Sequence, residues 1–99
     1  MLNIEKKGED GKLTIALEGR LDTTTSPELE KSLQESIAGV TELVMDLEGL
    51  EYISSAGLRV LLSAQKLMMK QGAMRVTHVA EPVMEILEVT GFVDILTIE

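Results

Sequence analysis

The stretch that decides the fold is LVMDLEGLEYISSAGLRVLL, residues 43–62. The apolar run 43–47 is typical of a strand that is buried on both faces, as a strand with parallel neighbours would be. We expect residues 48–53 to form a turn at Gly49 and then a short extended piece. The segment 54–57, Ser-Ser-Ala-Gly, then opens a helix. Two hydroxyl groups are therefore expected where a strand passes into a helix N-terminus.

The helix that begins there is expected to run to about Lys70 and to end at Gly72. It is apolar around most of its circumference, and such a helix is largely buried, with one narrow face left for water. Most of the six methionines are expected to fill the core, and Met69 is the one that can lie beside the polar face. The polar face consists of Arg59, Ser63, Lys66 and Lys70.

The sequence before residue 43 predicts a hairpin and then an amphipathic helix. Apolar and polar side chains alternate over residues 12–19, which is typical of a half-buried strand. Ser26 is the expected helix N-cap, Pro27 suits the first helical position, and Gly39 is the expected stop. The expected elements are a strand at 2–7, a turn at 8–11, a strand at 12–19 and a helix from 27 to about 37.

The sequence after the central helix predicts a strand, a third helix and a last short strand, at 73–79, 81–90 and 93–98. The whole order is β-β-α-β-α-β-α-β, and no repeat or linker interrupts it. Strands that alternate with helices indicate an α/β layer, and the initial hairpin adds an antiparallel pair. We therefore predict one domain over residues 1–99, with a mixed sheet of four to five strands and three main α-helices.

The composition excludes several classes of function. The formal net charge of −8 and the presence of only two aromatic residues argue against direct nucleic-acid binding. The chain has no cysteine, and its single histidine, His78, cannot form a histidine pair for a metal. We expect no cofactor and no metal. An apolar run long enough to span a membrane and a secretion signal are both absent, so a cytoplasmic location is expected.

The two serines at 54 and 55 suggest a modification site, but a simpler explanation exists. A helix N-terminus stabilises negative charge, so a phosphate on Ser55 could be held there without unfolding the helix. Gly57 would allow another backbone to approach closely, either from a partner or from a neighbouring turn. The simpler explanation is that a serine at a helix start is only a cap.

The chain resembles the STAS domains, and in particular the bacterial anti-sigma factor antagonists, over essentially its whole length. The segment Gly19-Arg20-Leu21-Asp22 is similar to the family's Gly-Glu-Leu-Asp, and residues 44–47 are similar to its hydrophobic strand that ends in Asp-Leu or Asn-Leu. The segment 52–58, YISSAGL, is similar to the family's aromatic-(Met/Ile)-Asp-Ser-(Ser/Thr)-Gly-Leu. The resemblance implies a single STAS domain.

The resemblance also implies a switch. Ser55 matches the serine that a partner kinase phosphorylates, and Ser54 is the alternative acceptor because it replaces the family's Asp. The implied function is that of an anti-sigma factor antagonist, which binds an anti-sigma factor kinase when unphosphorylated and is released on phosphorylation, with a phosphatase to reset it. The implied partner-binding residues are Asp22, Thr23, Ser54, Ser55, Ala56, Gly57, Leu58 and Arg59.

Three departures from the family pattern leave alternatives open: Arg20 in place of Glu, Ser54 in place of Asp, and Ala56 in place of a second hydroxyl. One alternative is a member that has lost phosphorylation and binds constitutively. Another is a scaffold or adaptor in a stress-signalling or transporter-associated complex.

An enzyme is not expected. A serine hydrolase would need a base beside Ser55, and His78 is the only histidine; a Gly-x-Ser-x-Gly elbow is also absent. A nucleotide site is not expected either, because the chain has no Gly-x-x-x-x-Gly-Lys-Ser/Thr loop.

Overall fold

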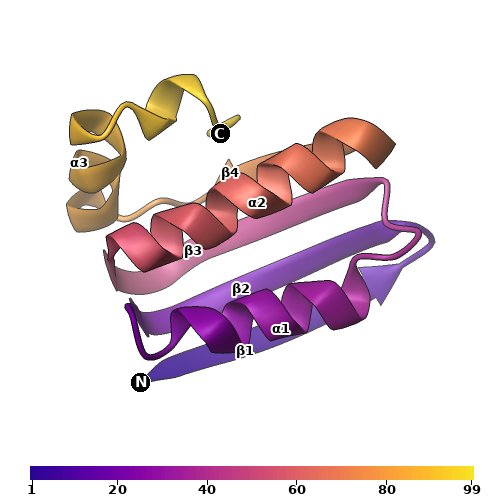
Figure 1. Cartoon of the computed structure of the whole chain (residues 1–99), viewed down its shortest axis with the longest axis horizontal. Helices are drawn as coiled ribbons and strands as arrows, with labels where there is room; N and C mark the ends of the chain where they lie inside the picture. The colour runs from indigo at the N-terminus through magenta and orange to yellow at the C-terminus, as the bar shows by residue number, and fades with distance from the viewer.

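The computed structural model describes all residues, 1–99, and confirms a mixed α/β fold (Figure 1). One four-stranded sheet has the order β1-β2-β3-β4, in which β1 and β2 are antiparallel and the other two pairs are parallel. The elements are β1 (Leu2–Glu9), β2 (Lys12–Leu21), α1 (Ser26–Ser36), β3 (Glu42–Ile53), α2 (Ser55–Gln71), β4 (Ala73–Thr77), α3 (Glu81–Val89) and the 3₁₀ helix η1 (Phe92–Asp94).

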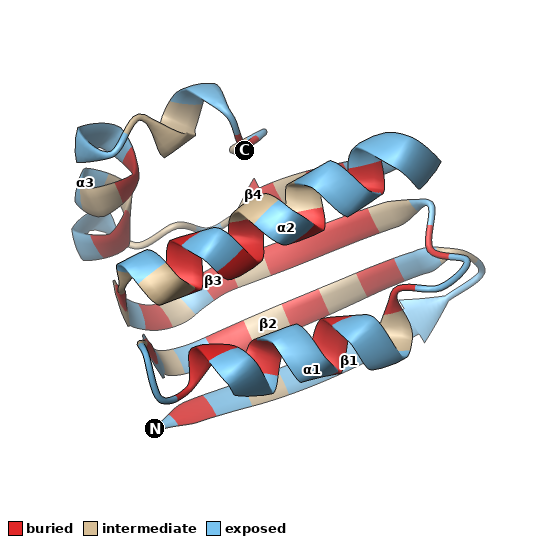
Figure 2. Ribbon diagram, in the orientation of Figure 1, coloured by how far each residue is buried: buried red, intermediate tan, exposed pale blue.

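Helices α1 and α2 lie side by side over one face of the sheet, and α3 lies beyond one end of α2 (Figure 1). The alternation in β2 explains this layering, because Leu13, Ile15 and Leu17 are buried while the residues between them are only partly buried. The buried set faces the helices, and the opposite face of the sheet has no covering layer (Figure 2). No helix of the protein combines the length and the apolar character needed to cross a membrane.

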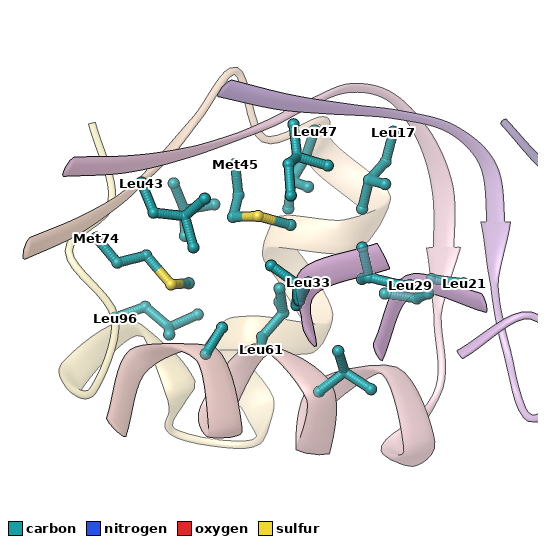
Figure 3. Close-up of a cluster of buried hydrophobic side chains, with 14 of the residues drawn as sticks. Leu17, Leu21, Leu29, Leu33, Leu43, Met45, Leu47, Leu61, Met74 and Leu96 are labelled. Atoms are coloured by element: carbon teal, nitrogen blue, oxygen red, sulfur yellow. The ribbon is translucent and has the colours of Figure 1, made fainter. Parts of the chain in front are cut away.

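The core lies between the sheet and the helices and is built almost entirely from leucine, isoleucine, valine and methionine. Leucines from β2, β3, α1 and α2 converge there, together with Met45 and Met74 (Figure 3). Met68 is also buried, so three of the six methionines fill the core, which is fewer than predicted. Met84 is half-buried, and Met69 is 73% exposed beside the polar face of α2. That polar face, with Arg59, is exposed as predicted.

The expected turn at Gly49 is wrong, because β3 continues through it to Ile53. The pairing with β2 shifts there instead: Ala16 lies opposite Asp46, but Glu18 lies opposite Gly49. A Cβ atom at Gly49 would lie 3.1 Å from side-chain atoms of Glu18. The glycine therefore marks a close approach at a bulge, where one strand gains a residue without leaving the sheet.

The expected N-cap of α1 is also wrong. The cap position is Thr25, and the Ser26 hydroxyl donates to the Asp22 carbonyl oxygen at 2.6 Å instead of accepting from a helix amide. Ser26 is buried, which places it under the loop rather than at the open end of the helix. Helix α2 starts and ends where predicted, with Ser54 as N-cap and Gly72 as C-cap. It is less buried than its apolar sequence predicted: six of its 17 residues are buried, and Leu67 and Met69 are exposed.

The last expected strand is reduced to a single bridge. Residues 92–94 form η1, and only Ile98 pairs with Val76, in parallel. The Val76 amide donates to the Thr97 carbonyl oxygen at 2.8 Å, and the Glu99 amide donates to the Val76 carbonyl oxygen at 2.9 Å. β4 ends at Thr77, two residues earlier than expected, so few of its residues are available to pair with the C-terminal segment.

Candidate functional site

Two loops meet at the carboxyl ends of β2 and β3, because these strands are parallel neighbours. Leu21 lies opposite Ile53, and the Ser54 amide donates to the Leu21 carbonyl oxygen at 2.8 Å. The loop after β2 therefore lies beside the start of α2. The sheet in this way brings together the predicted site residues around Asp22 and those around Ser55, which are more than thirty positions apart in the sequence.

A groove separates the N-terminal ends of α1 and α2. Its volume is about 190 Å³. Arg59 lies in its wall, and Glu30 of α1 supplies a carboxylate of opposite charge. The groove is lined by Thr23, Ser26, Pro27, Glu30, Ala56, Arg59 and Val60. It joins Thr23, Ala56 and Arg59, three of the predicted partner-binding residues, in one concave surface.

The two candidate hydroxyl groups have different surroundings. Ser54 is the N-cap residue, and its side-chain oxygen accepts from the Gly57 amide at 3.4 Å. Ser55 is the first residue inside α2, and it is exposed, whereas Ser54 is half-buried. Capping therefore occupies the Ser54 hydroxyl and leaves the Ser55 hydroxyl on the surface.

Gly57 and Leu58 are buried, so they shape the site from below rather than line its surface. A Cβ atom at Gly57 would lie 2.8 Å from Ile53 Cγ1 and 2.8 Å from Leu21 Cγ. The close approach that the glycine permits is thus made by the chain's own strands. It allows the first turn of α2 to rest directly on the ends of β2 and β3.

The Asp22 carboxylate organises the loop that leads into α1. Its Oδ1 accepts from the Thr24 hydroxyl at 2.8 Å, the Thr24 amide at 3.0 Å and the Thr25 amide at 3.1 Å. The Thr25 hydroxyl lies 3.1 Å from the same oxygen and 2.8 Å from the Arg20 carbonyl oxygen, its shorter acceptor. These hydrogen bonds, first that from the Thr24 hydroxyl, lower the pKa of Asp22 from 3.8 to about 2. Asp22 is therefore a charged residue whose carboxylate is tied to its own loop.

Arg20 was noted in the sequence only as a departure from the family pattern, and the structure assigns it a contact. Its guanidinium lies over the ring of Tyr52, 4.4 Å from the ring centroid, and its Nε atom is 3.9 Å from Asp22 Oδ2. Arg20 and Tyr52 are direct partners across β2 and β3. This partnership depends on a second register shift, between Gly19 and Arg20, which residue spacing alone does not reveal.

His78 lies just beyond β4, not within a strand as predicted. Its backbone φ is 53°, its side chain is exposed, and its Nδ1 atom lies 3.2 Å from Asp46 Oδ1. His78 is thus paired with a carboxylate of β3, on a different part of the sheet from the loop that contains Ser54 and Ser55.

Comparison with known proteins agrees with this architecture. The family model of the STAS domain matches residues 3–99. The chain is 37% identical over 91 residues to BtrV of Bordetella bronchiseptica, a match that covers 90% of this chain and 78% of that protein. It is 34% identical over 100 residues to the anti-sigma F factor antagonist of Paenibacillus polymyxa, with 98% and 86% covered.

Solved structures share the fold at lower identity. The unphosphorylated form of the anti-sigma factor antagonist SpoIIAA superposes with a TM-score of 0.84 at 16% identity, over 98% of this chain and 88% of that one. SpoIIAA of Bacillus in its phosphorylated form gives a TM-score of 0.76 at 15% identity, over 98% and 91%.

The chain belongs to the STAS domain family, since the family model spans nearly its whole length. Within that family it resembles the anti-sigma factor antagonists, the class to which the Paenibacillus relative and SpoIIAA belong by name.

Proposed function

We propose that this protein is an anti-sigma factor antagonist that binds an anti-sigma factor kinase while Ser55 is unphosphorylated and leaves it once Ser55 carries a phosphate. The observation that carries the proposal is an exposed serine at the first position of α2, beside a groove, within a STAS domain. The names of the relatives support the antagonist role. The kinase, the phosphatase and the phosphorylation are the proposed part.

Ser55 is the better acceptor of the two serines. A kinase must reach the hydroxyl and align it with ATP, and Ser55 is exposed, whereas Ser54 is half-buried and caps α2. The Ser55 oxygen would form a bond to the γ-phosphorus of ATP while the bond from that phosphorus to ADP breaks, and a base on the kinase would take the hydroxyl proton. A phosphatase would return the serine by hydrolysis.

The electrostatics of α2 suit a phosphate in the free protein. Its first turn contains no acidic residue, and the positive end of the helix dipole lies at Ser55. Arg59, one turn further along, lies at helical spacing from Ser55 and adds a positive charge. The phosphate would therefore stabilise rather than unfold the start of the helix.

A docked partner would change this balance. The partner would cover the groove and the start of α2, and a phosphate of charge about −1.5 to −2 would then have to lose its water. Unless the partner offers matching positive groups, the desolvation cost drives release. The switch would thus act through charge and contact, without a change of fold.

The test uses the full-length chain, the anti-sigma factor kinase encoded in the same organism, and ATP. Intact-mass measurement should show one added phosphate, and peptide mapping should place it on Ser55. Ser55→Ala should remove the phosphate and still bind the kinase, while Ser55→Asp should bind it more weakly. Ser54→Ala is the matched control, and it should be phosphorylated at the same position.

Three results would contradict the proposal. A phosphate on Ser54 would show that Ser54, and not Ser55, is the acceptor. Equal binding by Ser55→Asp and Ser55→Ala would remove the release mechanism. Capture of a membrane-transport complex from native cells, with no kinase, would favour the adaptor alternative.

A further inference from the structure

The open face of the sheet carries a cluster of possible metal ligands that the proposed switch does not use. Asp46 and Glu48 are two positions apart on β3, and buried Leu47 lies between them. Because side chains alternate along a strand, both carboxylates point away from the helices. His78 follows Thr77, which is the β4 partner of Asp46. Two neighbouring strands therefore bring these three side chains together.

The distances within this cluster suit a small cation. The ligand atoms of Asp46, Glu48 and His78 all lie within 4.8 Å of one another. His78 Nδ1 and Asp46 Oδ1 are 3.2 Å apart. Two ligands bound at about 2.0–2.1 Å to a tetrahedral ion are separated by about 3.3 Å, so this pair already has the required spacing. Glu48 is exposed, and its side chain has the rotational freedom to close the remaining gap.

A second observation concerns the hollow beside the cluster, which has a volume of about 330 Å³. Ala16 lies between Glu5 and Asp46 in the register of the sheet, and its small side chain leaves the space open. Four carboxylates line the hollow, those of Glu5, Glu18, Asp46 and Glu48, and no basic residue does.

The basic side chains of the neighbouring rows on this face, which include Lys7, Arg20 and Arg75, do not line the hollow. Arg20 of β2 lies over the ring of Tyr52 and near the Asp22 carboxylate. The alternation of β1 places Lys7 one row away from Glu5, outside the lining. Arg75 of β4 is already paired with Glu42 and with Glu99. A concave surface lined by charges of one sign raises the local concentration of counter-ions. The hollow therefore attracts cations to the position where His78 can bind one.

We propose that Asp46, Glu48 and His78 bind one divalent transition-metal ion of the Zn²⁺ class, with water completing the coordination. The imidazole decides the class of ion, because nitrogen ligands suit Zn²⁺ and its neighbours, whereas Mg²⁺ and Ca²⁺ prefer oxygen ligands alone. The bound ion would link β3 to the connection between β4 and α3. This inference does not depend on the proposed switch at Ser55.

The test is calorimetric titration of the untagged full-length chain with ZnCl₂ in metal-free buffer, followed by nitrogen-detected NMR of the histidine ring. We expect one ion per chain and a shift of the His78 ring signals. His78→Gln and Glu48→Gln should each weaken binding at least about tenfold, since loss of even an outer partner of a metal ligand has an effect of this size. MgCl₂ should not saturate the site.

Glu51→Gln is the matched control, because Glu51 is an exposed glutamate of the same strand outside the cluster and its replacement removes the same charge as Glu48→Gln. It should bind Zn²⁺ as the unchanged chain does. Failure of the unchanged chain to bind Zn²⁺ would overturn the proposal. So would equal weakening by Glu51→Gln and Glu48→Gln, or undiminished binding by His78→Gln, since either would mean that the ion is attracted only by the negative face. Thermal melting of each variant checks that it is folded.

Discussion

At the scale of single residues, the candidate site depends both on exposed side chains and on side chains that hold its loops in place through hydrogen bonds within the chain. Asp22 shows this most clearly, because its carboxylate accepts hydrogen bonds from Thr24 and Thr25 and thereby holds the loop beside the groove. The resemblance to the STAS family implies that Asp22 is a partner-binding residue. Its geometry adds a structural role, which is to fix the shape of the surface that a partner would meet.

The lowered pKa of Asp22 predicts a specific pH dependence. A carboxyl group whose pKa falls from 3.8 in the unfolded chain to about 2 in the folded one stabilises the fold above pH 3.8. That stabilisation is lost as the pH falls through about 2. NMR titration should find a pKa near 2 for the Asp22 carboxyl. Asp22→Asn should be less stable than the unchanged chain at neutral pH, and the difference should shrink below pH 3.8.

A difference in stability that stays constant from neutral pH to pH 2 would contradict this assignment. Glu28→Gln is the control, because Glu28 is an exposed carboxylate in the first turn of α1 and makes none of the loop's hydrogen bonds.

Gly57 predicts a second effect at the residue scale. In Gly57→Ala, the added methyl group would lie within 2.9 Å of three side-chain atoms of Leu21 and Ile53. Overpacking of this kind costs about 1–3 kcal/mol of unfolding free energy, which urea denaturation measures. Gly8→Ala is the control, since its nearest contact would be 3.9 Å away, and its effect should stay within about 0.5 kcal/mol. Equal stability of the two variants would show that the strand ends can move apart.

At the scale of elements, the start of α2 gives two adjacent serines different surroundings. Ser54 satisfies a helix amide, and Ser55 lies exposed at the first helical position. Ser54→Ala should therefore lower the unfolding free energy by about 0.5–1 kcal/mol, at the low end for an N-cap because the hydrogen bond is long. Ser55→Ala should leave stability nearly unchanged. Thermal melts of the two variants check this, and a larger loss for Ser55→Ala would reverse the roles.

At the scale of the whole molecule, the sheet separates two surfaces. Its covered face holds the core, while its open face holds the acidic hollow. The groove lies near the carboxyl ends of the central strands β2 and β3, between the N-terminal ends of α1 and α2. A phosphate at Ser55 and an ion at His78 would therefore act on different surfaces of the same rigid layer.

The layered core predicts that substitutions on the two faces of α2 differ sharply in their effect on the unfolding free energy. Leu61 is fully buried against the sheet, so Leu61→Ala should cost about 2–5 kcal/mol of unfolding free energy. Met69 on the same helix is 73% exposed, so Met69→Ala should change stability by no more than about 0.5 kcal/mol. Urea denaturation of both variants measures the contrast. Similar costs would mean that α2 is rotated about its axis.

The local pattern of the sequence determined the elements that depend on nearby residues. The alternation in residues 12–19 predicted β2, and Ser54 and Gly72 predicted both ends of α2, because periodicity and capping act within a few residues. The position of Ser55 at the start of α2 was predicted in the same way, whereas its role as a phosphate acceptor is a proposal that rests on the resemblance to the STAS family.

Tertiary pairing decided the rest. The bulge at Gly49, the contact of Arg20 with Tyr52 and the cluster around His78 all depend on the register between strands that are distant in sequence. The same is true of the last segment, where the short β4 leaves room for only one bridge to Ile98. Register is set by packing of the whole sheet against its helices, and no short stretch of residues contains that information.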